Sequence, residues 1–100
     1  MELIYHVTTQ AEWEKAQEDG FYKAASLDIE GFIHCSTAHQ VEGVLERYFA
    51  GKTNLVKLNI DPNKLTSKLI YELSPTINQE FPHVFGVINL DAIIQSEQIR

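Results

Sequence analysis

The sequence predicts a single α+β domain, and three observations support this fold class. The chain has 100 residues, 44% of them hydrophobic and 22% charged, which is enough to fill one hydrophobic core. Helical patterns are confined to the first half, and the second half is rich in strand-like segments. Two helices are too few to connect all of these strands in parallel. We therefore expect one domain over residues 1–100, with a mixed or largely antiparallel sheet and two main helices.

The first strand and the first helix are predicted by adjacent signals. Leu3–Val7 is rich in β-forming residues and predicts a strand. Thr9 and Glu12 form the capping-box pattern that begins a helix, because each side chain can satisfy a free backbone N–H of the first turn. Gly20 follows the run Ala11–Asp19 and is a suitable residue to end this helix.

A buried strand and a second helix follow. In the segment Ser26–Gly31 the glycine fits a turn, and Phe32–Cys35 predicts a buried strand after it. Thr37 and Gln40 repeat the capping-box pattern. The next residues have the i, i+3, i+4 spacing of an amphipathic helix, which we expect to end at Gly51; the apolar positions are Val41, Val44, Leu45, Tyr48 and Phe49.

The second half of the sequence predicts mainly β-strands. Leu55–Ile60 and Leu69–Leu73 read as strands, with a turn at Asp61–Asn63 between them. Phe81–Ile88 is expected to be extended after its proline, and the tail Ile93–Arg100 predicts a short helix or an edge strand. The order of the strands does not follow from these patterns.

Composition and charge exclude several classes of function. Eight basic and fourteen acidic residues give a net charge of −6 and a pI near 5.0, which disfavours binding to nucleic acids or anionic membranes. The single cysteine, Cys35, has no partner for an intramolecular disulfide. Met1–His6 lacks the features of a signal peptide, and no apolar run is long enough to span a bilayer. We expect a cytoplasmic location.

Three histidines are the strongest candidates for chemistry. His6, His34 and His83 all lie at ends of expected strands, where binding sites are commonly built, so we expect a shared pocket. A metal site is disfavoured, because the sequence has no His-x-His, His-Glu-x-x-His or Cys-x-x-Cys spacing. Among the carboxylates, Glu72 is the preferred functional acid because it lies near the end of a strand. Glu30 is expected to be an exposed residue before a turn.

The period of a strand separates the residues around His34 into two faces. Phe32, His34 and Ser36 should share one face, and Ile33 and Cys35 the other. His34 and Cys35 are therefore not expected to converge on one ligand. We interpret Cys35 as a small core residue, because no neighbour in the sequence would stabilise a thiolate.

Specific residue blocks resemble one small bacterial family, the domain-of-unknown-function family 952. The resemblance extends over nearly the whole chain, and the Glu-Gly-Phe-Ile-His-x-Ser and Phe-Pro-His blocks are its most specific parts. The matching positions are Ile4–His6, Trp13, Gly20, Ser26, Leu27, Glu30–Thr37, Gln40, Asp61, Glu72, Phe81–His83 and Gly86.

This resemblance implies an ADP-ribosyltransferase-like fold, a split mixed sheet whose cleft binds NAD in enzyme relatives. It implies that His6 on the first strand contacts an NAD ribose, and that a late-strand glutamate, loosely matched by Glu72, stabilises positive charge on the ribose as the nicotinamide leaves. We predict catalytic roles for His34, Glu72 and His83, and no metal ligand. Cofactor-binding roles are predicted for His6, Phe32 and Ser36.

Three hypotheses for the function remain open. The first is an enzyme that transfers ADP-ribose to an unknown protein acceptor or hydrolyses NAD. The second is a non-catalytic module that binds a small nucleotide, and the third is a protein-interaction domain whose histidines bond only to the backbone. An RNA 2′-phosphotransferase is disfavoured: it needs several arginines, and Arg47 and Arg100, one on the second helix and one at the last residue, are not expected to form a cluster.

Overall fold

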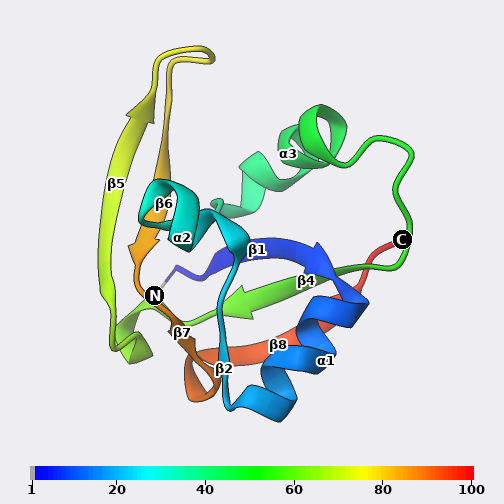
Figure 1. Cartoon of the computed structure of the whole chain (residues 1–100). Helices are drawn as coiled ribbons and strands as arrows, with labels where there is room; N and C mark the ends of the chain where they lie inside the picture. The colour runs from blue at the N-terminus through cyan, green and yellow to red at the C-terminus, as the bar shows by residue number, and fades with distance from the viewer. Residues whose placement is uncertain (1) are drawn as a thin grey trace.

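Three small sheets, arranged around a shared core, form the framework of the protein (Figure 1). The computed structural model describes residues 2–100. The helices are α1 (Gln10–Asp19), α2 (Ala25–Glu30) and α3 (Val41–Tyr48), with short 3-10 turns at Ala38–Gln40, Pro62–Lys64 and Leu90–Ala92. The strands are β1 (Ile4–Thr9), β2 (Phe21–Tyr22), β3 (Ile33–His34), β4 (Leu55–Ile60), β5 (Lys68–Ser74), β6 (Gln79–Phe85), β7 (Ile88–Asn89) and β8 (Ile93–Gln98). The α+β prediction is confirmed.

The sheets have the orders β1-β4-β8, β2-β7 and β3-β6-β5. Every strand pairing in the described part of the chain is antiparallel, so the antiparallel alternative of the two expected sheet types is confirmed and the mixed one is not observed. The reason is that α1, α2 and α3 each connect strands of different sheets, so that no helix forms a parallel crossover within one sheet. A two-bond bridge between Tyr5 and Ser36, with N···O distances of 2.8 and 2.7 Å, links β1 to the segment after β3.

The hydrophobic core lies between these sheets. Fully buried side chains from β1, β3, β4 and β6 include Ile4, Ile33, Leu58 and Val84, each with 0% exposure. A smaller cluster, made by Val7, Leu45 and Leu55, packs α3 against β1 and β4. The helices α2 and α3 both contribute to the wall of one cavity, and both lie above β1 in the view of Figure 1.

The helix signals in the sequence are confirmed at α1 and, in part, at α3. The Thr9 side chain accepts a hydrogen bond from the backbone N–H of Glu12, and Gly20 adopts a left-handed conformation at φ +87°. The second capping box is also present, but its residues form a 3-10 turn before α3 begins at Val41. The apolar stripe of α3 is only partly buried, since Tyr48 is 65% exposed.

Two local predictions were incomplete. The expected turn over residues 26–31 is the helix α2, which is followed by Gly31 at φ +88°. The expected single strand over residues 81–88 is divided into β6 and β7 around Gly86. This glycine has φ +158°, and a Cβ there would lie 2.4 Å from Ser67 Oγ, so the chain turns where no side chain fits. The tail forms the edge strand β8, one of the two structures expected for it.

Candidate functional site

One face of the β3-β6-β5 sheet carries a cluster of aromatic and imidazole rings. His34 on β3 lies directly opposite His83 on β6, and their ring centroids are 5.0 Å apart with planes at 84°. Phe32 stacks on His83 with a centroid distance of 4.1 Å and an angle of 13°. The register thus holds two imidazoles side by side, with an aromatic ring supporting one of them.

Each of these histidines has a carboxylate partner. His83 Nδ1 lies 2.7 Å from Glu72 Oε1, because Glu72 on β5 is the diagonal neighbour of His83 on the same face. His34 Nε2 lies 2.5 Å from Glu30 Oε2 at the end of α2. An ionised carboxylate only accepts hydrogen bonds, so the bonded nitrogen of each ring carries the proton. In the neutral ring the other nitrogen, Nε2 of His83 and Nδ1 of His34, then has a free lone pair.

His6 on β1 is held differently, because both of its ring nitrogens are bonded within the protein. Nδ1 lies 2.5 Å from the carbonyl oxygen of His34, and Nε2 lies 2.7 Å from the hydroxyl of Tyr22. Burial lowers the pKa of His6 to about 4, so the ring is neutral near pH 7. Because a carbonyl can only accept, Nδ1 donates to His34, and Nε2 accepts from Tyr22.

Tyr22 extends this arrangement toward the surface. Its side chain is 1% exposed, and its hydroxyl also lies 3.0 Å from Thr8 Oγ1, which lies 2.8 Å from Glu12 Oε1. Because the Tyr22 proton is donated to His6, the single Thr8 hydroxyl proton can be donated either to Tyr22 or to Glu12. Burial raises the pKa of Tyr22, so that it stays a neutral hydrogen-bond donor. The network ties β1, β2 and α1 together beneath His6.

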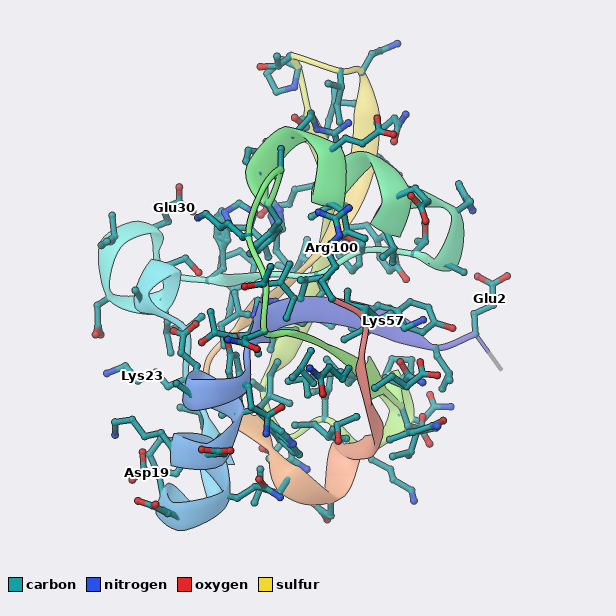
Figure 2. The ribbon with its side chains drawn as sticks, turned by 90° about the vertical axis from the view of Figure 1, so that its right-hand side faces the viewer. Glu2, Asp19, Lys23, Glu30, Lys57 and Arg100 are labelled. Carbon is teal, nitrogen blue, oxygen red and sulfur yellow. The ribbon has the colours of Figure 1, made fainter. Side chains whose placement is uncertain are left out.

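A cavity of about 590 Å³ brings the three histidines together. Its walls come from α2, α3, β1, β3, β5 and β6, and its polar groups include His6, His34, His83 and Glu30. Most of the remaining wall is apolar: Val7, Ile29, Val44, Tyr48, Phe49 and Phe81. In Figure 2, Glu30 lies on α2, at the level of α3. The protein therefore has a cavity of ligand size with three imidazoles and one carboxylate in its wall.

The other predicted site residues lie around this cavity and outside its lining. Glu72 reaches the cavity only through its hydrogen bond to His83, and Phe32 is stacked on that ring. Ser36 is buried, and its backbone forms the bridge to Tyr5. Among the described residues these three are not part of the cavity wall, so their predicted roles require contact through a neighbour.

The alternation expected around His34 is observed. Ile33 and Cys35 are buried in the same core cluster, whereas the side chain of His34 is exposed and its ring contacts Phe32. Cys35 also borders the cavity that His34 lines. Cys35 is 2% exposed, and burial raises the pKa of its thiol to about 12, which agrees with its interpretation as a core residue.

Sequence reasoning missed two residues of the site, Glu30 and Tyr22. Glu30 was expected to be merely exposed, but Gly31 reverses the chain after α2 and turns His34 back toward it. The spacing Glu-Gly-x-x-His therefore carried a usable signal. No signal in the sequence indicated Tyr22, because its contacts with His6 and Thr8 depend on how β2 lies against β1.

No group of three or more His, Cys, Asp or Glu side chains within residues 2–100 is arranged to hold a metal ion. Within the same residues, no helix is both long enough and apolar enough to cross a bilayer.

Comparisons with known proteins identify the family. The family model described as "Protein of unknown function (DUF952)" matches residues 7–96. The chain belongs to this family. It is similar to the crystal structure of CC0527 from Caulobacter crescentus, with 28% identity, a TM-score of 0.89, and coverage of 98% of this chain and 86% of that chain. The solution NMR structure of CC0527 gives 29% identity and a TM-score of 0.84, covering 99% and 85% of the two chains.

No curated protein matches the chain significantly. The family is shown by the match to its sequence model, and the fold by the likeness to the solved structures. The implied likeness to ADP-ribosyltransferases and an activity on NAD stay predictions.

Proposed function

We propose that this DUF952 protein binds NAD or a related nucleotide in the cavity and cleaves the bond between nicotinamide and ribose. The products are nicotinamide and ADP-ribose, which is transferred either to water or to a protein acceptor. One observation carries the proposal: His6, His34, His83 and Glu30, from four different elements, line one cavity, and two of the histidines have a carboxylate partner.

The cavity suits such a ligand in size and in character. Its volume of about 590 Å³ lies within the range of roughly 300–1,000 Å³ that is usual for small-molecule sites. Tyr48, Phe49 and Phe81 offer aromatic surface to a planar ring. Glu30 offers negative charge to the pyridinium ring of NAD and to the positive charge that develops on the ribose.

The arrangement supports a simple reaction. The C1′–N bond breaks, its electron pair neutralises the pyridinium nitrogen, and neutral nicotinamide leaves without needing a proton. The resulting oxocarbenium carbon is stabilised by the Glu30 carboxylate and attacked by water or an acceptor group. The proton of that nucleophile passes to the free lone pair on Nε2 of His83. The balance is NAD plus water giving ADP-ribose, nicotinamide and a proton.

The geometry assigns different tasks to the two residues that the family resemblance emphasised. Glu72 holds the Nδ1 proton of His83 and is a positioning residue in this proposal. His6 already uses both ring nitrogens, so it can hydrogen-bond to a ribose only by releasing His34 or Tyr22. We therefore propose that His6 shapes the cavity wall through its ring and holds β3 in place.

The test is a titration of the protein with NAD, ADP-ribose and nicotinamide, followed by amide chemical shifts, with chromatography of the same samples for released nicotinamide. We expect shifts at residues of the cavity wall together with release. Glu30→Gln should lower the release rate about 10²-fold, because it removes the charge that faces the oxocarbenium ion. Glu18→Gln, which changes an exposed carboxylate on α1, is the matched control and should leave the rate unchanged.

The outcomes separate the open hypotheses. Shifts without release of nicotinamide would establish a binding module in place of an enzyme. The absence of any shift at millimolar NAD would remove NAD as the ligand of this cavity. Equal rates in wild type and Glu30→Gln would contradict the assigned chemistry.

A further inference from the structure

Three cationic side chains contact Tyr48 or Phe49, the residues at the end of α3 that line the cavity. Arg47 lies with its guanidinium carbon 5.8 Å from the ring centroid of Tyr48. The ammonium of Lys52 lies 5.6 Å from the ring centroid of Phe49, and Arg100 Nη1 donates to the Phe49 carbonyl at 3.2 Å. Figure 1 shows the C-terminus beside the segment that follows α3, and Figure 2 shows Arg100 next to that helix. Arg100 is thus held beside Phe49 although it is distant in the sequence, and the Arg47 guanidinium lies over Gly43, one turn back along α3.

These cations have no carboxylate partners. Lys15, Lys23 and Lys57 each lie within 4.0 Å of an acidic side chain. In the described part of the chain no such pair is formed by Arg47, Lys52 or Arg100. The protein carries a net charge of −6, so a group of three unpaired cations on it is a distinctive local feature.

The helix terminus alone does not account for this charge. The C-terminal end of a helix carries roughly half a negative charge, which attracts cations in its last turn. Three full positive charges are more than this partial negative charge can neutralise, and only Arg100 is bonded to a carbonyl there. The excess positive charge is available to an anion.

The position of the cluster relates it to the cavity. Tyr48 and Phe49, which the cations contact, both line the cavity, whereas no Lys or Arg of residues 2–100 does. A ligand that carries phosphate therefore finds no permanent positive charge next to the histidines and meets it only at this edge. We infer that Arg47, Lys52 and Arg100 form a rim that binds the phosphate groups of a nucleotide whose ribose lies against the histidines.

This inference rests on the proposed nucleotide ligand and names the part of the ligand that the rim selects. It predicts that the protein distinguishes NAD from nicotinamide riboside, which has the same reacting bond and no phosphate. The expectation that Arg47 and Arg100 form no guanidinium cluster stays a prediction, and β8 brings Arg100 to the carbonyl of Phe49 after α3.

The test uses inorganic pyrophosphate, NAD and nicotinamide riboside as separate probes of the full chain. Pyrophosphate alone should shift the amides of residues 47–52. The double variant Arg47→Gln/Lys52→Gln should weaken binding of pyrophosphate and of NAD about tenfold, because two charge-assisted contacts are lost, and leave the riboside unaffected. Lys64→Gln/Lys68→Gln removes two other unpaired lysines, which do not contact the cavity wall, and should change each affinity less than about twofold.

The failure of the rim and the failure of the proposed function are distinguishable. Nicotinamide release from NAD with no effect of pyrophosphate, or with equal rates for NAD and its riboside, would overturn the rim and keep the reaction. Pyrophosphate binding that is lost in the rim variant, without any release of nicotinamide, would support the rim and overturn the reaction. Unfolding of the variant would be detected by its urea midpoint. The wild-type protein then supplies the test: added salt should weaken pyrophosphate binding, and binding that does not depend on salt would overturn the rim.

Discussion

His6 and His83 line the same cavity, but the protein holds them in opposite ways. His6 is enclosed so that both ring nitrogens are bonded to protein atoms, and burial lowers its pKa to about 4. His83 is bonded to a carboxylate through one nitrogen, and in the neutral ring the other is a free base. The comparison teaches that a histidine in a cavity wall is assigned to structure or to chemistry by its partners, and residue type alone does not decide.

The comparison of His6 with His83 also shows what each of the two sheets contributes to the cavity. The β1-β4-β8 sheet contributes His6 as a fixed connection to β3 and β2. The β3-β6-β5 sheet contributes the His34 and His83 rings, whose carboxylates come from α2 and β5. The β1-β4-β8 sheet thus contributes a histidine whose hydrogen bonds are all made within the protein, and the β3-β6-β5 sheet contributes histidines that can exchange protons.

The largest effect is expected from removing the free base. His83→Gln should lower nicotinamide release about 10²- to 10⁴-fold, the usual contribution of a general base, with little change in the urea midpoint. His39→Gln is the matched control, because His39 is exposed and does not line the cavity. A His83→Gln variant that releases nicotinamide as fast as the wild type would show that His83 is not the base.

The next effect concerns stability and tests the assignment of His6. In the unfolded chain His6 binds a proton below pH 6.5, whereas in the folded protein it does so only below about pH 4. The unfolded state therefore holds more protons between these values, and stability falls as the pH is lowered through this window. By pH 4, protonation of His6 in the unfolded chain lowers the free energy of unfolding by about 3 kcal/mol.

Urea unfolding at pH 7, 6, 5 and 4 measures this loss. His6→Gln should flatten the dependence on pH, and His39→Gln should leave it as in the wild type. A His6→Gln variant with the same slope as the wild type would show that another group is responsible and that His6 is not held neutral by burial.

The local parts of this structure could be predicted from the sequence. The beginning of α1 depends on Thr9 and Glu12, which are three residues apart, and its end depends on Gly20. The strand β4 was predicted with its observed bounds, Leu55–Ile60, because an apolar run between two turns needs no distant partner to be recognised. The shared pocket of the three histidines was also predicted, but its stated reason holds for one of them: His34 ends β3, whereas His6 and His83 lie within β1 and β6.

The parts that depend on register could not be predicted in the same way. The Glu72–His83 pair requires that β5 and β6 align with Ile70 opposite His83, and a shift of one residue would move Glu72 to the other face. The contact of Arg100 with Phe49 requires the whole chain to be folded first. Charge and spacing restricted the candidates, and non-local packing decided which of them meet.

The smallest of the expected effects tests the support beneath His6. Tyr22→Phe removes the hydroxyl that lies 2.7 Å from His6 Nε2 and 3.0 Å from Thr8 Oγ1, while keeping the buried ring. We expect a loss of about 1–3 kcal/mol in the free energy of unfolding, since His6 Nε2 is then left without a hydrogen-bond donor. Denaturant titration at pH 7 measures it.

Tyr71→Phe is the control for this change, because Tyr71 is 46% exposed and its hydroxyl has no hydrogen-bond partner among residues 2–100. Its effect should stay within about 0.5 kcal/mol. Equal stability of the two variants would mean that the bond from Tyr22 adds nothing to the folded state, and His6 would then be free to turn Nε2 toward a ligand. A clear difference would keep His6 in its structural role and leave the proton chemistry to His34 and His83.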